Sequence, residues 1–245
     1  MVVPTYNERE RIGELVRAVF EACRSQGIRL EMVVVDDNSP DGTGLVADEL
    51  ARTYPLRVIH RTGKLGLGTA VVAGFSVAAS GTVGVMDADF SHPPSAVPGL
   101  FAVFEATRAD VVIGSRYIPG GSTPNWPLWR RMLSRAACTA ARPLSPVRDA
   151  ASGFFLIRRD IASRVAIQAG GFKICLELLV RGRPDTVVEL PYVFAGRTAG
   201  ESKMNVKEAL GFLVQLRDLY RFQRARPRLS QTYRRMSPDQ VRTAG

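Results

Sequence analysis

The chain has 245 residues, of which 46% are hydrophobic, and carries a formal net charge of +10 at neutral pH. This length and apolar content suit one large domain or two small ones, and we favour one domain followed by a tail. The charge favours an anionic partner: nucleic acid, a phospholipid surface or a phosphorylated substrate. Only two histidines and three widely spaced cysteines are present, which argues against a histidine-rich metal site, a zinc site and a disulfide framework.

The first third of the chain alternates between strand and helix patterns. A short strand at 1–3 is predicted to stop at Pro4, and Asn7 is predicted to cap a helix that ends near Gly27. The next expected elements are a strand at 30–35, a helix at 45–54, a strand at 56–60 and a helix at 69–79. Repeated strand and helix units predict a doubly wound, mostly parallel sheet with helices on both faces.

Residues 65–86 contain no charged side chain and are long enough to cross a bilayer. Five glycines interrupt this stretch, so a helix followed by a buried strand explains it better than a membrane span. The chain also opens without the basic and apolar regions of a signal peptide. We therefore expect a cytoplasmic protein, a setting that also suits unpaired cysteines.

Two carboxylates, Asp87 and Asp89, directly follow a predicted strand at 83–86, and the prolines Pro93 and Pro94 prevent that strand from continuing. They therefore fall at the carboxyl end of the strand, where open α/β sheets bind ligands. Two hard oxygen ligands so close together suit Mg²⁺ or Mn²⁺ shared with a diphosphate. The alternative is an ordinary polar turn.

The segment 61–70, RTGKLGLGTA, has glycines that let the backbone approach a ligand, and its Lys64 is placed to meet phosphate. It does not match a P-loop, because no Gly-Lys-Ser/Thr sequence closes it. Lys64 is equally well explained as a solubilising loop residue.

Further strand and helix patterns follow the carboxylates. We expect a helix at 96–107, a strand at 110–113 that leads into Gly-Ser-Arg116-Tyr, and a basic helix at 128–141. A loop through Asp149 enters another strand, and a helix at 172–180, a strand at 186–193 and a polar loop with Arg197 and Lys203 complete the region.

The C-terminal part is predicted to begin with an amphipathic helix at 205–222, in which Lys207, Gly211, Gln215 and Asp218 form one polar face. This helix either docks on the core or lies on a membrane, because the segment 221–235 is strongly basic. We expect disorder after residue 226. The predicted organisation is a domain at 1–203, a helix at 204–225 and a basic disordered tail at 226–245.

The ordered motifs PTYNE, VVDDNSPDGT, RTGKLGLGTA, MDADFSHPP, GSRY, NWPLWRRMLS, SGFF, FKICLELLVRG and RxxGESK resemble the family 2 glycosyltransferases of the dolichol-phosphate mannose synthase group. The resemblance spans residues 2–213. It implies a Rossmann-like GT-A fold, GDP-mannose as the sugar donor, Mg²⁺ or Mn²⁺ as cofactor, and a dolichyl or polyprenyl phosphate as acceptor.

Carried over residue by residue, the resemblance implies four groups of site residues. The nucleotide would contact Pro4, Tyr6, Glu8, Asp37 and the backbone near Val35. The metal and diphosphate would lie among Asp87, Ala88, Asp89 and Ser91, with Asp87, Asp89 and Ser91 as metal ligands. Arg116 and Arg130 would receive the acceptor phosphate and, with Asp89, form the catalytic set. Lys64, Arg116, Arg197 and Lys203 would complete the donor site.

The chemistry agrees with this division of roles. A phosphate monoester is largely dianionic at neutral pH, so the acceptor needs no carboxylate base. Positioning by arginine and metal stabilisation of the leaving GDP then suffice, and attack from the opposite face inverts the anomeric carbon. The guanidinium fork of arginine suits bidentate contact with phosphate.

Simpler roles compete for several of these residues. Asp37 is also a candidate cap of the following helix, and Glu8 a stabiliser of its own helix N-terminus. Arg130 is alternatively a solvated helix residue, with Arg131 competing for its role. Ser91 stands where some relatives have Gln, and Ala150-Ala151 where relatives often carry Pro.

Many bacterial members of the family continue into transmembrane helices, which we do not find in this sequence. Attachment to the cytoplasmic membrane face would then come from the amphipathic helix, the lipid substrate or a partner protein. The rival function is transfer of glucose or another sugar to undecaprenyl phosphate or to a soluble acceptor. A nucleic-acid-binding role is disfavoured, since no recognition motif is found.

Overall fold

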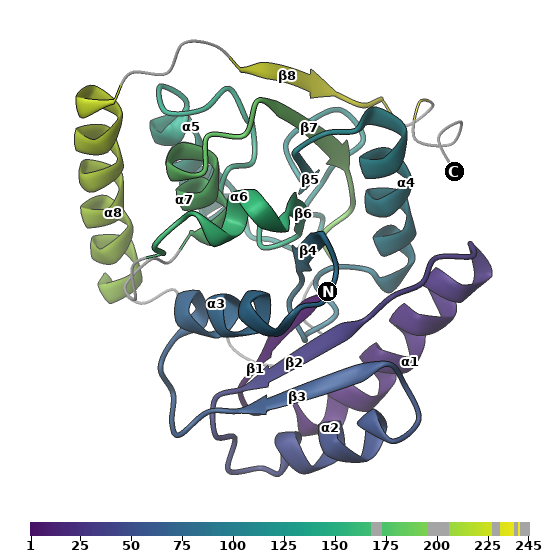
Figure 1. The fold of residues 1–245 in the computed structure, drawn as a ribbon. Helices are drawn as coiled ribbons and strands as arrows, with labels where there is room; N and C mark the ends of the chain where they lie inside the picture. The colour runs from purple at the N-terminus through teal and green to yellow at the C-terminus, as the bar shows by residue number, and fades with distance from the viewer. Residues whose placement is uncertain (168–172, 196–205, 227–230, 238–239, 241–245) are drawn as a thin grey trace.

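The computed structural model describes residues 1–167, 173–195, 206–226, 231–237 and 240. Within them, eight strands form one sheet in the order β3-β2-β1-β4-β6-β5-β7-β8 (Figure 1). The strands are β1 Val2–Thr5, β2 Met32–Asp36, β3 Leu56–His60, β4 Thr82–Val85, β5 Val111–Ser115, β6 Phe155–Arg158, β7 Thr186–Pro191 and β8 Thr232–Arg235. β6 runs antiparallel to β4 and β5, and the other pairs are parallel, so the predicted mostly parallel sheet is confirmed.

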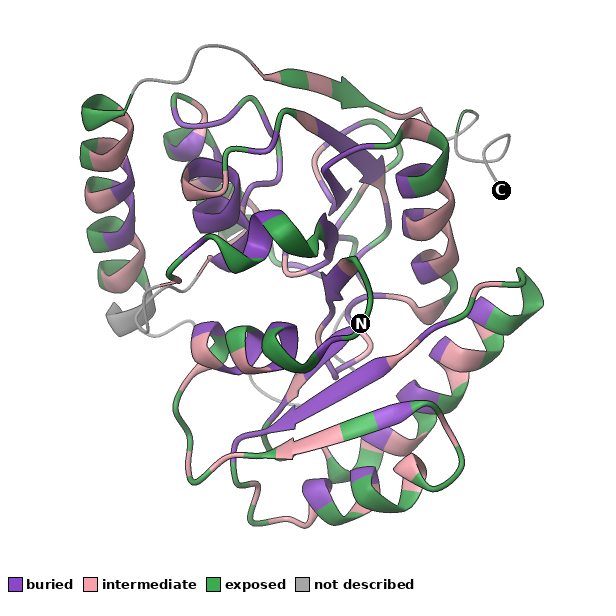
Figure 2. Ribbon diagram, in the orientation of Figure 1, coloured by how far each residue is buried: buried purple, intermediate pink, exposed green. Residues whose placement is uncertain are grey.

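Helices cover both faces of the sheet (Figure 1). They are α1 Arg9–Ser25, α2 Thr43–Ala51, α3 Leu67–Val77, α4 Val97–Thr107, α5 Leu128–Ala141, α6 Arg159–Ser163, α7 Ile174–Arg181 and α8 Val206–Ala225. One apolar cluster lies between the sheet and helices α1, α2 and α4, and a second between the sheet and helices α3, α6, α7 and α8. The central strands supply both clusters and are buried along their length (Figure 2).

β1 continues past the point where the sequence predicted its end. Pro4 lies within the strand and pairs with Val35 of β2. The carbonyl of Val2 accepts from Met86 on the β4 side, so Pro4, two residues on, turns its missing donor to the same side. β4 has ended by then, and a proline costs no ladder hydrogen bond there.

Asn7 does not cap α1: it adopts a positive φ of 60°, and Glu8 occupies the N-cap position without a side-chain cap hydrogen bond. The amide of Asn7 instead donates to the hydroxyl oxygen of Ser39 at 3.0 Å. The turn after β1 is therefore tied to the turn after β2, and the helix starts from that junction.

The basic tail contains a strand that the sequence analysis placed in a disordered segment. β8 pairs in parallel with β7, and Thr232 donates its amide to Asp185 while Met236 donates to Glu189. Thr232 and Tyr233 favour strands, and the otherwise open edge of β7 supplies the partner that local composition does not reveal.

α8 also differs from its predicted polar face. Gln215 is buried and bonds the backbone of Lys173 and the carboxylate of Glu177, while Leu210 and Leu213 are exposed. Among the described helices, none combines the length and apolar character needed to cross a bilayer.

Candidate active site

β1, β2 and β4 are parallel and end at one edge of the sheet, where their loops gather the predicted donor-site residues. Tyr6 and Glu8 follow β1, Asp37 follows β2, and the 87–91 loop follows β4. The switch in strand order beside β1 places a crevice site at this edge.

The 87–91 loop carries the carboxylates and is sharply bent. Asp89 is buried, accepts the amide of Ser91 at 3.0 Å, and is followed by Phe90 with a φ of 61°. The carboxyl of Asp87 is about two-fifths exposed, with 38% of its side-chain surface accessible. One carboxylate is thus held in place while the other faces solvent.

These residues fit a divalent cation. Ser91 Oγ is fully buried and has no hydrogen-bond partner in the described part of the chain, which an oxygen-seeking ion or its water would satisfy. The described residues contain no cluster of three or more His, Cys, Asp or Glu able to hold a metal by themselves. The two carboxylates and one hydroxyl of Asp87, Asp89 and Ser91 suit Mg²⁺ or Mn²⁺, because these ions take one or two carboxylates and complete their coordination shell with water and phosphate oxygens.

His92 supports the loop from behind. Its Nδ1 accepts the amide of Asp87 at 3.0 Å, and its ring stacks on Phe154 with centroids 5.0 Å apart. Burial lowers the pKa of His92, although Asp87 and Asp89 act in the opposite sense. A neutral ring is what an Nδ1 acceptor requires, so His92 fixes the backbone from which Asp87 projects.

Asp37 is already engaged by the glycine-containing loop. It accepts from Arg61 Nη1 at 2.5 Å and from the amide of Gly66 at 3.1 Å. Arg61 also donates through Nη2 to Thr69 Oγ1 at 2.5 Å. Both members of the ion pair are nearly buried, at 8% and 9% side-chain exposure. Asp37 does not cap α2: Gly42 occupies the N-cap position, and Asp41 before it accepts the amide of Thr43 at 2.9 Å.

The remaining predicted donor residues surround these carboxylates in different ways. Lys64 places its ammonium 3.9 Å from the ring centroid of Tyr6. Glu8 accepts from Arg11 at 3.1 Å, and Val35 is fully buried in the core. Ala88 is buried between the two carboxylates, while Arg197 and Lys203 lie outside the described residues.

Arg116 begins a second, cationic group at the end of β5. Its Nε and Nη2 each donate to Asp149 at 2.7 Å, and its own amide donates to the same carboxylate at 2.9 Å. Burial opposes its charge, but Asp149 outweighs burial and raises the pKa of Arg116 above its ordinary value. The guanidinium therefore stays charged in an interior position.

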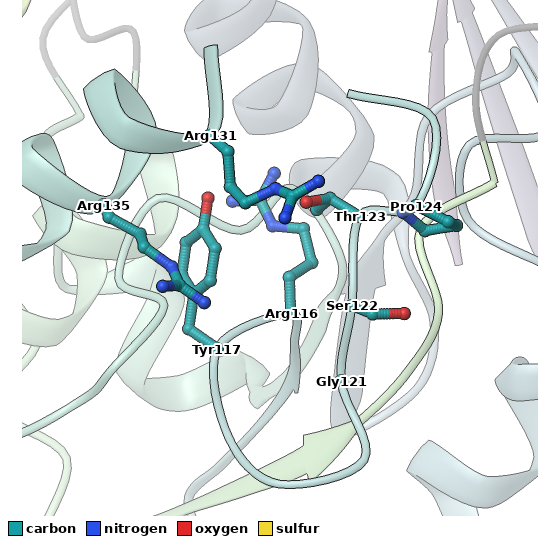
Figure 3. Close-up of a pocket in the computed structure, with 8 residues that line it drawn as sticks. All are labelled: Arg116, Tyr117, Gly121, Ser122, Thr123, Pro124, Arg131 and Arg135. Atoms are coloured by element: carbon teal, nitrogen blue, oxygen red, sulfur yellow. The ribbon is translucent and has the colours of Figure 1, made fainter. Parts of the chain in front are cut away.

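A cavity of about 120 Å³ opens above this arginine (Figure 3). Arg116, Tyr117 and Arg131 point toward one another, and Arg135 stands over the Tyr117 ring with 5.6 Å from guanidinium carbon to centroid. Gly121, Ser122, Thr123 and Pro124 form the opposite wall. Three guanidiniums around a small opening suit a compact, multiply charged anion.

Arg130 is placed differently from Arg131. Arg130 stacks on the indole of Trp126, 4.1 Å from the ring centroid, whereas Arg131 lines the cavity and donates to the carbonyl of Trp126 at 3.5 Å. Leu128, Trp129, Met132 and Leu133 share the adjoining face of α5 and are all at least 48% exposed.

The sequence alone does not assign Arg61, Asp149 or Arg135 to the site, and it leaves Arg131 as a competitor of Arg130. A basic helix was visible, but helical periodicity does not say which arginine faces a cavity. Arg61 and Asp149 act through partners 24 and 33 residues away, a relation that only the order of strands establishes.

The model of Glycosyl transferase family 2 matches residues 1–166. The chain is 41% identical over 225 residues to a dolichol-phosphate mannosyltransferase of Pyrococcus furiosus, which covers 90% of this chain and 62% of the relative, so the chain spans less than two thirds of that protein. It is 42% identical to a polyprenol monophosphomannose synthase of Mycolicibacterium smegmatis, over 86% of this chain and 83% of the relative. A dolichol-phosphate mannosyltransferase of Saccharomyces cerevisiae is 38% identical, over 91% and 86%.

Solved structures share the fold at low identity. Glucosyl-3-phosphoglycerate synthase of Mycobacterium tuberculosis gives a TM-score of 0.64 at 19% identity, covering 89% of this chain and 78% of that one. Mannosyl-3-phosphoglycerate synthase of Rubrobacter xylanophilus gives 0.63 at 20% identity, over 94% and 75%. These likenesses concern the fold alone, and they agree with the predicted sheet flanked by helices.

Proposed function

This chain belongs to glycosyl transferase family 2, and from that premise we propose that it transfers mannose from GDP-mannose to a dolichyl or polyprenyl phosphate with inversion at the anomeric carbon. The names of the relatives support mannosyl transfer to such a lipid phosphate. The observation that carries the proposal is the pairing of an arginine-lined cavity with an exposed apolar helix face, α5, which together match a phosphate on a hydrocarbon chain.

The donor belongs at the carboxyl edge of β1, β2 and β4. Tyr6, Lys64 and Asp37 would face the nucleotide, and Asp87, Asp89 and Ser91 would hold a divalent cation against the diphosphate. The structures of M. tuberculosis glucosyl-3-phosphoglycerate synthase with Mn²⁺ and UDP support a metal in this fold without deciding between Mg²⁺ and Mn²⁺. When bound, the cation stabilises the negative charge of the departing nucleoside diphosphate.

The acceptor phosphate belongs in the cavity. Asp149 fixes the side chain of Arg116, so its remaining nitrogen donor can contact a phosphate without a further loss of side-chain freedom. Arg131 and Arg135 of α5 line the same cavity. We assign Arg131 rather than Arg130 to phosphate contact, because Arg131 lines the cavity and Arg130 stacks on Trp126. A dianionic phosphate held here is already a nucleophile and needs no general base.

Attachment to a membrane surface is part of the same proposal. On a helix with 3.6 residues per turn, Arg131 and Arg135 border the exposed apolar stripe Leu128, Trp129, Met132 and Leu133. α8 adds exposed Leu210, Leu213 and Val214, followed by exposed Arg221, Arg224 and Arg226. Apolar side chains beside cations are typical of peripheral binding to anionic bilayers, and we propose this for the cytoplasmic membrane face.

A donor and acceptor screen with purified protein tests the proposal. GDP-mannose and UDP-glucose are each offered with polyprenyl phosphate or with 3-phosphoglycerate, and the radiolabelled product is extracted into organic solvent. We expect transfer from GDP-mannose to the lipid, loss of transfer in excess EDTA, and recovery with Mg²⁺ or Mn²⁺. Asp89→Ala is expected to be inactive, with Asp48→Ala, an exposed carboxylate of α2, as the matched control.

Preference for UDP-glucose would favour the rival function, transfer of glucose. A water-soluble product from 3-phosphoglycerate would show that the acceptor is a soluble phosphate and not a lipid. Full activity in EDTA would remove the metal from the mechanism.

A further inference from the structure

The direction of Arg116 in the cavity depends on a loop outside regular secondary structure. Asp149, which takes three hydrogen bonds from Arg116, lies in the turns between α5 and β6 and is wholly buried. A displacement of this loop would move the guanidinium with it, since the bidentate contact transmits both position and plane.

Glu189 of β7 anchors that loop. Its Oε2 accepts the amide of Arg148 at 2.8 Å and its Oε1 accepts the amide of Asp149 at 3.0 Å. Glu189 has no exposed surface, so these contacts are shielded from water. One buried carboxylate thereby fixes two successive peptide groups immediately beside the partner of Arg116.

The C-terminal strand supplies a third donor to Glu189. Tyr233 lies opposite Val187 in the β7–β8 register, and its hydroxyl donates to Oε2 of Glu189, the diagonal neighbour on the same face of the sheet. Burial and the neighbouring carboxylate both raise the pKa of Tyr233 above its ordinary value. The phenol therefore remains a donor at neutral pH.

We propose that Tyr233 is a positioning residue for Arg116: through Glu189 and then Asp149, the C-terminal strand sets the geometry of the phosphate-binding arginine. Arg116 donates to Asp149, whereas the side-chain contacts described for Glu189 come from neutral donors, namely two backbone amides and the Tyr233 hydroxyl. Loss of one donor loosens its hold on the loop. The functional consequence rests on the proposed role of Arg116 with the acceptor phosphate.

Tyr233→Phe removes the hydroxyl and keeps the ring. The matched control is Tyr54→Phe, which removes a hydroxyl beside β3 at the opposite edge of the sheet, from a ring stacked on Phe20. We expect the KM for polyprenyl phosphate in detergent micelles to rise at least about threefold in Tyr233→Phe, as befits loss of a hydrogen bond to a charged group. The Kd for GDP, measured by calorimetry, should stay unchanged, and Glu189→Gln should raise the KM further.

An observation independent of activity follows Arg116 directly. The Nε–Hε resonance of Arg116, assigned through Arg116→Lys, should shift or exchange faster with solvent in Tyr233→Phe and stay fixed in Tyr54→Phe. A wild-type resonance together with a wild-type lipid KM in Tyr233→Phe would overturn the inference. If the wild-type protein transfers no mannose but the resonance still moves, the proposed function fails and the positioning role stands.

Discussion

At the scale of single residues, Asp37 and Arg61 form a nearly buried ion pair at the edge of the sheet that carries the predicted donor residues. The pair joins the end of β2 to the loop after β3, and Gly66 adds its amide to the same carboxylate. Breaking one partner of a nearly buried pair leaves the other charge without compensation. The pair therefore anchors the loop that carries Lys64.

Arg61→Ala is expected to weaken GDP binding by about tenfold, because the 61–66 loop loses its anchor and Asp37 is left unpaired. Calorimetry with GDP measures the effect. Arg57→Ala is the control, since Arg57 lies on β3, the strand that leads to Arg61, and makes an exposed pair with Glu31 at 2.8 Å. Equal GDP affinity in both variants would contradict the role of the pair.

The sequence was informative about some of these residues and silent about others. Asp87 and Asp89 were predictable, because a strand that runs into acidic residues and prolines has a defined carboxyl end. Arg61 was not, since it lies one residue beyond β3 and meets Asp37 only because β2 and β3 are neighbours. The choice of Arg131 over Arg130 likewise depends on how α5 is rotated against the cavity wall.

At the scale of elements, α8 has two apolar faces with different surroundings. Leu216 and Leu219 are buried against the core beside α7, while Leu210, Leu213 and Val214 face outward. The buried face holds the helix on the domain, and the exposed face is available to a bilayer. Periodicity left docking and membrane contact open; docking holds for the buried side of the helix, and membrane contact stays a prediction for the exposed side.

We expect the double variant Leu210→Glu and Leu213→Glu to lose binding to anionic liposomes in flotation assays and to keep its unfolding free energy. Leu219→Ala should do the reverse, retaining flotation and losing about 2–5 kcal/mol of stability in urea denaturation. Binding of the wild type should weaken toward about 1 M salt, where the Debye length falls to roughly 3 Å. Flotation of the double variant at the wild-type level would exclude α8 from the membrane contact.

Element boundaries followed the sequence well where a local signal existed. The strand at 56–60 and the helix at 128–141 were predicted to the residue, as β3 and α5. The antiparallel direction of β6 and the existence of β8 were not predictable, because both depend on which strand edge is open and not on the residues of the strand itself.

At the scale of the whole molecule, the three cysteines are buried on both sides of the sheet and can be used to probe its packing. Cys23 lies on α1, Cys138 on α5 and Cys175 on α7, and all are buried. Burial raises the pKa of Cys23 to about 11 and that of Cys138 to about 12, and it raises that of Cys175 well above its ordinary value. Because the thiolate is the reactive form, the folded protein should resist alkylation.

Iodoacetamide at pH 8 is expected to leave all three thiols unmodified in the native protein and to modify all three in urea, as intact-mass spectrometry would show. The labelling rate at intermediate urea should follow global unfolding, since each thiol lies in a packed layer. Rapid native labelling of any single cysteine would reveal a locally open region at that helix.

The position of β8 in the chain has a consequence for how the protein is made. β7 ends at residue 191 and β8 at residue 235, so the ribosome adds 44 residues between the two strand ends. At about 5–20 residues per second, this takes roughly 2–9 s. During that interval the apolar strand Val187–Leu190 has an unpaired edge on the nascent chain, open to pairing with another polypeptide. Codon choice and chaperone access over residues 192–235 should therefore influence the yield of folded protein more than the same changes over residues 37–60, which separate the end of β2 from the end of β3.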